Sequence, residues 1–487
     1  MFRCLKQKVE IMTSFLSAST KSSRRSVSRS ILVWFAAGLA SSAMATQPNL
    51  PGDWPTYGNG PAHTGYFPGK LNGLPFVQKW KTPMPHNVIS QAAIGGGRVY
   101  VSAGYYFSAM SLRALDANTG AGVWTNTLPG ANSISPPTCD SGAVYNQQGQ
   151  GVSPSYIRSF DAATGSTNWA TSFTSQGYNY MAPVVAGGRV FSDTGYYHGL
   201  TSYDQAGGGQ QWFVELGGSE QWAPAYYNGK VYTWLGSFTE WDPATGAVNW
   251  TVTNGLSGAA STRTVAIADG RSYFVGSSLY CVDLGTHTNA WAVSGGFSGT
   301  PAVANGIVYA ISNHFVSAFT TNGVFVRQFD PNSYYENYYG PLIVTDDVLM
   351  AVGAYGVYIY RLADGTLQQL ISSYDPSCFC YQSAAISLAN NTLYVVSGDK
   401  NVYAYAATPT TSATLTHVDR LGNGAFKFSF TNTPGATFTA WASTNVALPL
   451  SNWTALGYVP EISSGQYQFT DTNAIANARR YYRVSSP

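Results

Sequence analysis

Short apolar and polar runs alternate along most of the chain and are separated by glycine-containing turns, the pattern of strands joined in hairpins. One turn recurs with a glycine three positions before an aromatic residue and a β-branched or small residue between them. Glycine supplies the positive φ that a tight hairpin needs. The aromatic positions are Tyr100, Tyr145, Phe191, Tyr232, Tyr273 and Tyr309, and weaker copies have Met350 and Tyr394 there. These eight copies predict eight repeating units.

In the first five units a second hairpin carries an aspartate eight residues before a tryptophan, and the last three units have lost this pair. The copies read ALDANTGAGVW, SFDAATGSTNW, SYDQAGGGQQW, EWDPATGAVNW and CVDLGTHTNAW, with their aspartates 45, 43, 38 and 41 residues apart. We expect each aspartate to accept backbone hydrogen bonds within its turn, and each tryptophan to pack between neighbouring units. A period near 40 residues built from strands is typical of a propeller blade.

The last repeat lacks an outer strand, and the segment Phe76–Thr82 offers one, with Trp80 in the expected place. A ring closed by this N-terminal strand has no exposed sheet edge at the seam. We therefore predict an all-β protein, an eight-bladed β-propeller closed by an N-terminal strand and followed by a small β-sandwich. The expected parts are a lead-in at 46–75, the propeller at 76–407, a linker at 408–412 and the sandwich at 413–487.

The C-terminal segment contains six or seven short alternating strands with turn signals, which fits a small sandwich. It resembles the fibronectin-type-III-like modules found at the ends of secreted bacterial proteins. Such a module can be a spacer or an interaction unit. Trp441 and Trp453 are candidate sugar contacts.

Residues 1–45 have the features of a signal peptide: a basic stretch, an apolar run from Ile31 to Ala40 and small residues at Ala43–Ala45. The apolar run of about ten residues is too short to span a bilayer; a membrane anchor is the alternative. The segment predicts an exported protein, located in the periplasm, on the cell surface or outside the cell. The remaining chain has 18 basic and 22 acidic residues, which argues against a nucleic-acid partner. We expect no membrane span and a monomer.

The repeats resemble the PQQ-like, quinoprotein-type β-propeller family over about residues 53–407. The lead-in from Trp54 to Tyr66 is similar to the segment that often precedes such repeats in secreted bacterial proteins. The family contains quinone-dependent dehydrogenases and also non-catalytic propellers such as the outer-membrane-assembly lipoprotein. The resemblance implies the fold and leaves the activity open.

For the dehydrogenase branch the resemblance implies adjacent cysteines over the quinone, and Glu, Asn and Asp ligands to calcium. This chain has Cys378-Phe379-Cys380 instead, either bridged or as two thiols, and no positions that match the calcium set. We predict no catalytic residue, no metal and no cofactor. PQQ with calcium belongs only to the alternative of a PQQ-dependent dehydrogenase. A carbohydrate-active enzyme drawing on Glu220, Glu336 or Asp375 is a weaker alternative.

In a propeller, the loops that enter the inner strands share one face with the loops between the second and third strands. Here these loops are rich in aromatic residues and poor in charge, which suits stacking on sugars or packing against a protein. We predict a binding or scaffolding role for this face, with a glycan or a secreted or cell-envelope protein as ligand. The alternative is that the rings pack between blades. The candidate contacts are Tyr105, Tyr106, Tyr178, Tyr180, Tyr196, Tyr197, His198, Trp222, Tyr334, Tyr335, Tyr338, Tyr339 and Tyr381.

Overall fold

The computed structural model describes the chain from residue 52 onward, with short gaps. The described ranges are 52–71, 74–85, 90–104, 110–128, 131–149, 154–175, 180–195, 197–217, 222–258, 264–331, 338–375, 380–381, 384–406, 413–432, 438–448, 450–463, 465–474 and 479–485. The predicted signal peptide and the predicted linker at 408–412 lie outside these ranges. No helix in the described ranges is both long and apolar enough to span a bilayer.

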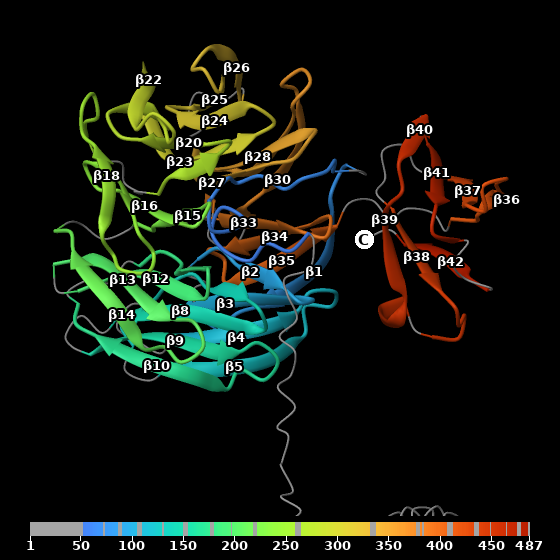
Figure 1. Ribbon diagram of the computed structural model, residues 1–487, viewed down its shortest axis with the longest axis horizontal. Coiled ribbons are helices and arrows are strands. Elements are labelled where there is room, and N and C mark those ends of the chain that lie inside the picture. The colour runs from blue at the N-terminus through green and yellow to red at the C-terminus, as the bar shows by residue number, and fades with distance from the viewer. Residues whose placement is uncertain are drawn as a thin grey trace, which may run out of the picture. The chain divides into compact units, whose positions relative to one another are not determined.

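Eight antiparallel sheets of four or five strands make up the larger part of the described chain (Figure 1). The first three are β2 (Ala93–Gly95), β3 (Arg98–Gly104), β4 (Met110–Asp116) and β5 (Gly122–Leu128); β6 (Ser133–Ile134), β7 (Thr138–Asp140), β8 (Ala143–Gly149), β9 (Ser155–Asp161) and β10 (Thr167–Phe173); and β11 (Val184–Ala186), β12 (Arg189–Thr194), β13 (Gly199–Asp204) and β14 (Gln210–Glu215). The next two are β15 (Ala225–Tyr227), β16 (Lys230–Trp234), β17 (Phe238–Trp241) and β18 (Val248–Val252); and β19 (Ala266–Ala268), β20 (Arg271–Val275), β21 (Ser278–Asp283) and β22 (Thr288–Ser294).

The remaining three sheets complete the series. They are β23 (Phe297–Ala304), β24 (Ile307–Ser312), β25 (Phe315–Thr320) and β26 (Phe325–Phe329); β27 (Tyr338–Val344), β28 (Val348–Gly353), β29 (Gly356–Arg361) and β30 (Leu367–Ser372); and β33 (Ala384–Ala389), β34 (Thr392–Ser397), β35 (Asn401–Ala406) and β1 (Val77–Pro83). The short pair β31 (Tyr374–Asp375) and β32 (Cys380–Tyr381) lies between the last two sheets in sequence. The inner strands contact one another in the order β2, β7, β11, β15, β19, β23, β27, β33 and back to β2. This closed ring confirms the predicted all-β propeller.

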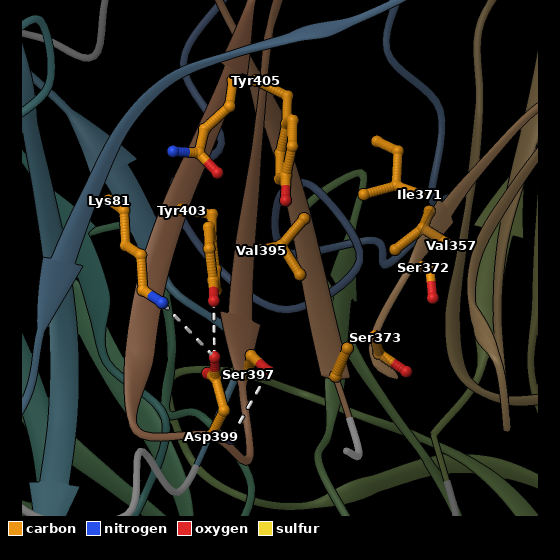
Figure 2. Close-up of a pocket in the computed structure, with 12 residues that line it drawn as sticks. Lys81, Val357, Ile371, Ser372, Ser373, Val395, Ser397, Asp399, Tyr403 and Tyr405 are labelled. Atoms are coloured by element: carbon orange, nitrogen blue, oxygen red, sulfur yellow. Dashed lines mark hydrogen bonds and ion pairs between the residues drawn. The ribbon is translucent and has the colours of Figure 1, made fainter. Parts of the chain in front are cut away.

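The ring is closed by the strand nearest the N-terminus, as predicted. β1 pairs antiparallel with β35 and completes the sheet that begins with β33. Trp80 lies opposite Ala404 and is buried. The same two strands line the cavity drawn in Figure 2.

The repeated aspartates cap their own turns. Asp116 Oδ1 accepts hydrogen bonds from the backbone N–H of Asn118 at 3.0 Å and of Thr119 at 2.8 Å, and from Thr119 Oγ1 at 2.9 Å. Asp161, Asp242 and Asp283 accept the corresponding bonds in their own turns. The predicted structural role of these carboxylates is confirmed.

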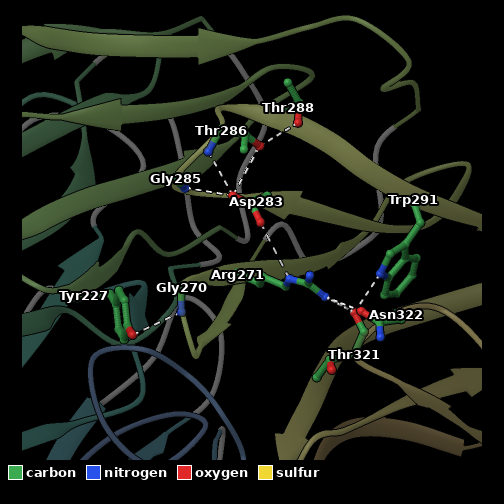
Figure 3. A network of polar contacts seen from close by, with 10 residues as sticks. All are labelled: Tyr227, Gly270, Arg271, Asp283, Gly285, Thr286, Thr288, Trp291, Thr321 and Asn322. Atoms are coloured by element: carbon green, nitrogen blue, oxygen red, sulfur yellow. Dashed lines mark hydrogen bonds and ion pairs between the residues drawn. The ribbon is translucent and has the colours of Figure 1, made fainter.

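The repeated tryptophans join their sheets to the second hairpin turn of the next sheet, and Trp250 does so by stacking on His287. Trp124 Nε1 donates to Ala162 O at 3.0 Å, and the indole lies so close to Gly165 that an added Cβ would be 2.6 Å from its ring atoms. Equivalent contacts join Trp80 to Gly120, Trp169 to Gly208, Trp212 to Gly246 and Trp291 to Gly323. Figure 3 shows one junction, where Trp291 Nε1 and Arg271 both donate to Thr321 O while Arg271 also faces Asp283. The predicted packing of tryptophan between blades is thus confirmed.

The aspartate turns predict an acid sensitivity. Hydrogen bonds from backbone and side-chain donors to the charged form hold the pKa values of Asp116, Asp242 and Asp283 below their ordinary value. A carboxylate whose pKa is lower in the folded than in the unfolded protein stabilises the fold at pH values above its unfolded pKa. This contribution is lost as the pH falls through the folded-state pKa. We expect the melting temperature to fall below about pH 4. The triple variant D116N/D242N/D283N should show a smaller fall over the same titration, and an identical pH profile would contradict this origin.

The lead-in follows the inside of the ring and crosses from sheet to sheet (blue in Figure 1). The carbonyl groups of the lead-in accept hydrogen bonds from backbone N–H groups of the inner strands. Each donor lies six residues before the aromatic residue of the repeated hairpin, or before Met350 in its place. The pairs are Ile94 to Trp54 at 2.8 Å, Cys139 to Pro55 at 2.8 Å, Tyr226 to Pro61 at 2.8 Å, Ile267 to Ala62 at 2.9 Å, Val303 to Thr64 at 2.7 Å and Val344 to Gly65 at 2.9 Å. The segment therefore satisfies donors on the inner edge of six sheets, and it does so next to the first hairpin turns.

His63 anchors the lead-in at the middle of its path. The imidazole is buried, with Nδ1 2.8 Å from Tyr57 O and Nε2 2.9 Å from Pro224 O. Burial lowers the pKa of His63, and the two carbonyl acceptors oppose that shift. The side chain thus ties two turns of the lead-in to the sheet that begins with β15.

The C-terminal segment forms two small sheets around a core of its own. One contains β36 (Thr416–Arg420), β37 (Phe426–Thr431), β41 (Gln466–Asp471) and β40 (Glu461–Ser463), and the other contains β39 (Thr454–Tyr458), β38 (Thr439–Ser443) and β42 (Tyr481–Ser485). A 3-10 turn, η1 (Leu450–Asn452), precedes β39. Phe430 of the first sheet packs against Phe438, next to β38 of the second. The Trp441 and Trp453 indoles donate to Ser485 Oγ and Leu448 O, both at 2.9 Å, so both are held within this module.

Candidate functional site

The candidate face lies at the end of the inner strands opposite the lead-in. Successive strands of each sheet run in opposite directions, so the loops entering the first strand and the turns between the second and third strands share one end. The lead-in bonds lie at the other end, beside the turns between the first and second strands. The lead-in therefore crosses the end of the propeller opposite the candidate face, and a ligand at that face would not contact it.

The structure describes five of the predicted contact side chains. Tyr105, Tyr106, Tyr178, Tyr196, Tyr334 and Tyr335 lie outside the described residues, and Tyr339 and Tyr381 have described backbones in β27 and β32 without described side chains. Glu220, Glu336 and Cys378 are also outside, and the side chains of Asp375 and Cys380 are not described.

Three of the five described rings are packed between sheets. Trp222 is 1% exposed in a cluster with Phe191 and Trp241. Tyr338 lies in a buried cluster with Ala302 and Tyr309 of the preceding sheet, and the buried Tyr180 lies edge-on to Phe173 of the preceding sheet. These three rings therefore have the surroundings that the alternative interpretation, packing between blades, predicts. Trp222 Nε1 is buried without a hydrogen-bond partner among the described residues, so its contact with a ligand stays a prediction.

Tyr197 and His198 lie together on the turn between β12 and β13. Tyr197 is 62% exposed, whereas the neighbouring His198 is buried. His198 Nδ1 is 2.9 Å from Asp193 Oδ2, and the backbone N–H of Gly199 donates to Asp193 Oδ1 at 3.3 Å. The buried carboxylate therefore holds the turn that carries the exposed ring. Sequence reasoning missed Asp193, because no motif marks it and its importance comes from the imidazole folded back onto it.

A cavity of about 270 Å³ opens at the same end, between the sheet ending in β30 and the sheet closed by β1 (Figure 2). Lys81 Nζ is 4.0 Å from Asp399 Oδ2, and Tyr403 OH donates to the same oxygen. Tyr403 and Tyr405 stack with ring centroids 5.9 Å apart. None of these residues carried a sequence signal, because they come from strands that meet only when the ring closes.

The dehydrogenase branch implies a calcium site, and the described side chains offer no cluster of ligands for one. Calcium takes six to eight oxygen ligands, and no three His, Cys, Asp or Glu side chains gather within the described ranges. Of the acids at this end, Asp193 is already bonded to His198 and Asp399 to Tyr403.

The repeats, the tryptophan junctions and the ring define a β-propeller of the PQQ-like class. The family model described as outer membrane protein assembly factor BamB matches residues 77–170 and 153–369, which together span 293 of the 487 residues. The chain belongs to this family. A search of curated proteins finds no match.

Solved structures share the fold at low sequence identity. BamB from Moraxella catarrhalis aligns with a TM-score of 0.53 and 16% identity, covering 68% of this chain and 98% of that one. Quinohemoprotein alcohol dehydrogenase from Comamonas testosteroni aligns with a TM-score of 0.54 and 16% identity, covering 76% and 83%. The computationally designed Ika8 protein gives 0.53 and 13%, covering 68% and 99%. At these identities the likeness shows the fold alone.

The two interpretations of Trp222, packing between blades and contact with a ligand, predict different effects of its removal on the free energy of unfolding. Replacing this buried ring with alanine should lower the free energy of unfolding by about 3–5 kcal/mol, because the cavity left behind cannot fully collapse. Tyr197→Ala removes an exposed ring and should change it by less than about 0.5 kcal/mol. Chemical denaturation of both variants measures the difference. A Trp222→Ala protein as stable as the parent would show that the ring is free to serve a ligand.

Proposed function

We propose that this chain is an exported, non-catalytic binding propeller that holds a protein partner of the cell envelope at the face carrying Tyr197. The observation that carries the proposal is the exposed tyrosine on a turn held by the buried Asp193–His198 pair. The family description, an assembly factor for outer membrane proteins, supports a protein partner. The basic and apolar N-terminal segment supports export.

The physical argument rests on preorganisation. A tyrosine presents a large amphipathic ring and loses little side-chain entropy on binding, and a turn fixed in advance lowers the ordering cost further. The tryptophan junctions and the lead-in hold the sheets behind the turn in place. We assign no cofactor to this role, and the C-terminal module is proposed as a separate spacer or interaction unit.

Site-specific photo-crosslinking tests the proposal. A photoreactive amino acid at position 197 is compared with one at Val324, which is also 62% exposed but lies beside an outer strand of another sheet. In the native envelope we expect a discrete protein adduct from position 197 and not from position 324. Tyr197→Ala should then weaken binding to the identified protein by about tenfold or more at unchanged thermal stability. Equal adducts from both positions, or none from 197, would contradict the proposal.

Reconstitution tests the non-catalytic part separately. The purified mature protein is incubated with PQQ and calcium, followed by absorbance and dye-linked alcohol oxidation. Tight quinone uptake with turnover would overturn the proposal in favour of a dehydrogenase. We expect neither uptake nor turnover.

A further inference from the structure

The cavity beside the closing strand combines an apolar wall with a polar floor. Val357 and Ile371 of the sheet ending in β30 face Val395 and the half-buried Tyr405 of the last sheet (Figure 2). Ser397 and Asp399 lie at the turn between β34 and β35 and line the same space. One side of the cavity can therefore contact the C–H groups of a ligand, while the other can form hydrogen bonds with it.

The polar groups of the cavity are nearly balanced in charge. Asp399 is paired with Lys81 at 4.0 Å and accepts from Tyr403 OH. Lys81 Nζ also lies 5.1 Å from the centre of the Tyr403 ring. Burial raises the pKa of Tyr405, and Asp399 raises it further, so this phenol stays protonated near neutral pH. A neutral ligand with several hydroxyl groups fits this floor better than an ion does, because neither charge is left to be neutralised.

One hydroxyl group in the wall of the cavity forms no hydrogen bond with the described residues. Ser373 Oγ is buried and has no hydrogen-bond partner among the described residues, although it lines the space. A buried polar group without a partner costs free energy, so it favours a ligand or a water that can bond to it. The volume of about 270 Å³ lies just below the range typical of drug-sized ligands, which indicates one small ring.

We propose that this cavity binds a single neutral pyranose ring, either free or at the end of a glycan. The apolar face of the sugar lies against Tyr405 and the aliphatic wall, and its hydroxyls bond to Asp399 and Ser373. The site uses none of the residues of the Tyr197 turn. It goes beyond the proposed protein-binding role, and either can fail without the other.

Saturation-transfer NMR on the mature chain tests the site. The probes are the methyl glycosides of glucose, galactose, mannose and N-acetylglucosamine, each at millimolar concentration. We expect saturation of ring protons in at least one probe, and a dissociation constant about tenfold higher for Tyr405→Ala. Val324→Ala, at an exposed position outside both sites, serves as the control and should leave sugar binding unchanged. A disaccharide ending in the same ring separates the two sources: equal affinity indicates a free sugar, and tighter binding indicates a glycan end.

A second variant guards against loss of the fold. Ser372 is exposed and lines the cavity, so Ser372→Tyr should fill the space from outside and abolish binding without disturbing the core. No saturation with any probe, or saturation that persists in folded Tyr405→Ala and Ser372→Tyr, would overturn the proposal.

Discussion

Replacing Gly165 with alanine is expected to lower the free energy of unfolding by about 2–4 kcal/mol. The residue has a φ of +74°, and a Cβ there would lie 2.6 Å from the Trp124 ring. The left-handed backbone costs about 1 kcal/mol for a residue with a Cβ. The overlap with the indole adds about 1–3 kcal/mol, because the ring is held by its bond to Ala162 O and cannot move aside freely.

Gly188→Ala is the matched control, since Gly188 has the same φ of +74° and nothing within 4 Å of an added Cβ. It should cost only the backbone part, about 1 kcal/mol. Equilibrium unfolding in urea measures both. In a Trp124→Ala background the cost of Gly165→Ala should fall to that of the control. Equal costs for the two glycines in the parent chain would show that the tryptophan junction contributes nothing.

Removal of the lead-in should have the larger effect. A chain beginning at residue 74 keeps β1 but loses Trp54, Tyr57 and His63, all of which are buried, together with carbonyl acceptors for six inner strands. Loss of one buried tryptophan alone costs about 3–5 kcal/mol, and a domain has only about 5–15 kcal/mol in total. We expect the cooperative unfolding transition to be lost.

Near-ultraviolet circular dichroism and thermal scans measure this loss. The control chain begins at residue 52 and keeps every described contact of the lead-in, so it should melt at the same temperature as a chain that begins at residue 46. The melting temperature of Trp54→Ala, made in the chain that begins at residue 46, should lie between those of the two truncated chains. A chain beginning at 74 that melts cooperatively within about 5 °C of the control would show that the ring is stable without its crossing segment.

The repeat was predictable because its signals are local. An aspartate turn needs only residues two and three positions later, and the turn glycine reports a positive φ at one residue. The eight-residue offset placed each tryptophan on an outer strand. The closing strand could be predicted by counting strands in each repeat. The last repeat lacked an outer strand, and a strand with Trp80 at the expected position preceded the first repeat.

The candidate face was predictable only in outline. Loop position and aromatic content placed Tyr197, Trp222 and Tyr338 at one end of the ring, but composition could not separate an exposed ring from a packed one. Burial depends on which neighbouring sheet covers the ring, and the covering residues of Trp222 come from two sheets. Asp193 escaped notice for a different reason: its partner His198 is only five residues away, but no motif records that the turn folds the imidazole back onto the carboxylate.

The sequence by itself determined the strands, the repeat, the tryptophan junctions and the closing segment, because these depend on spacings within one or two repeats. Only the tertiary structure decided the path of the lead-in, the burial of Trp222 and Tyr338, and the cavity between Tyr405 and Ile371. Each of these joins residues that are far apart in the chain. Closing the ring brings them together, and no local propensity records contacts at that distance.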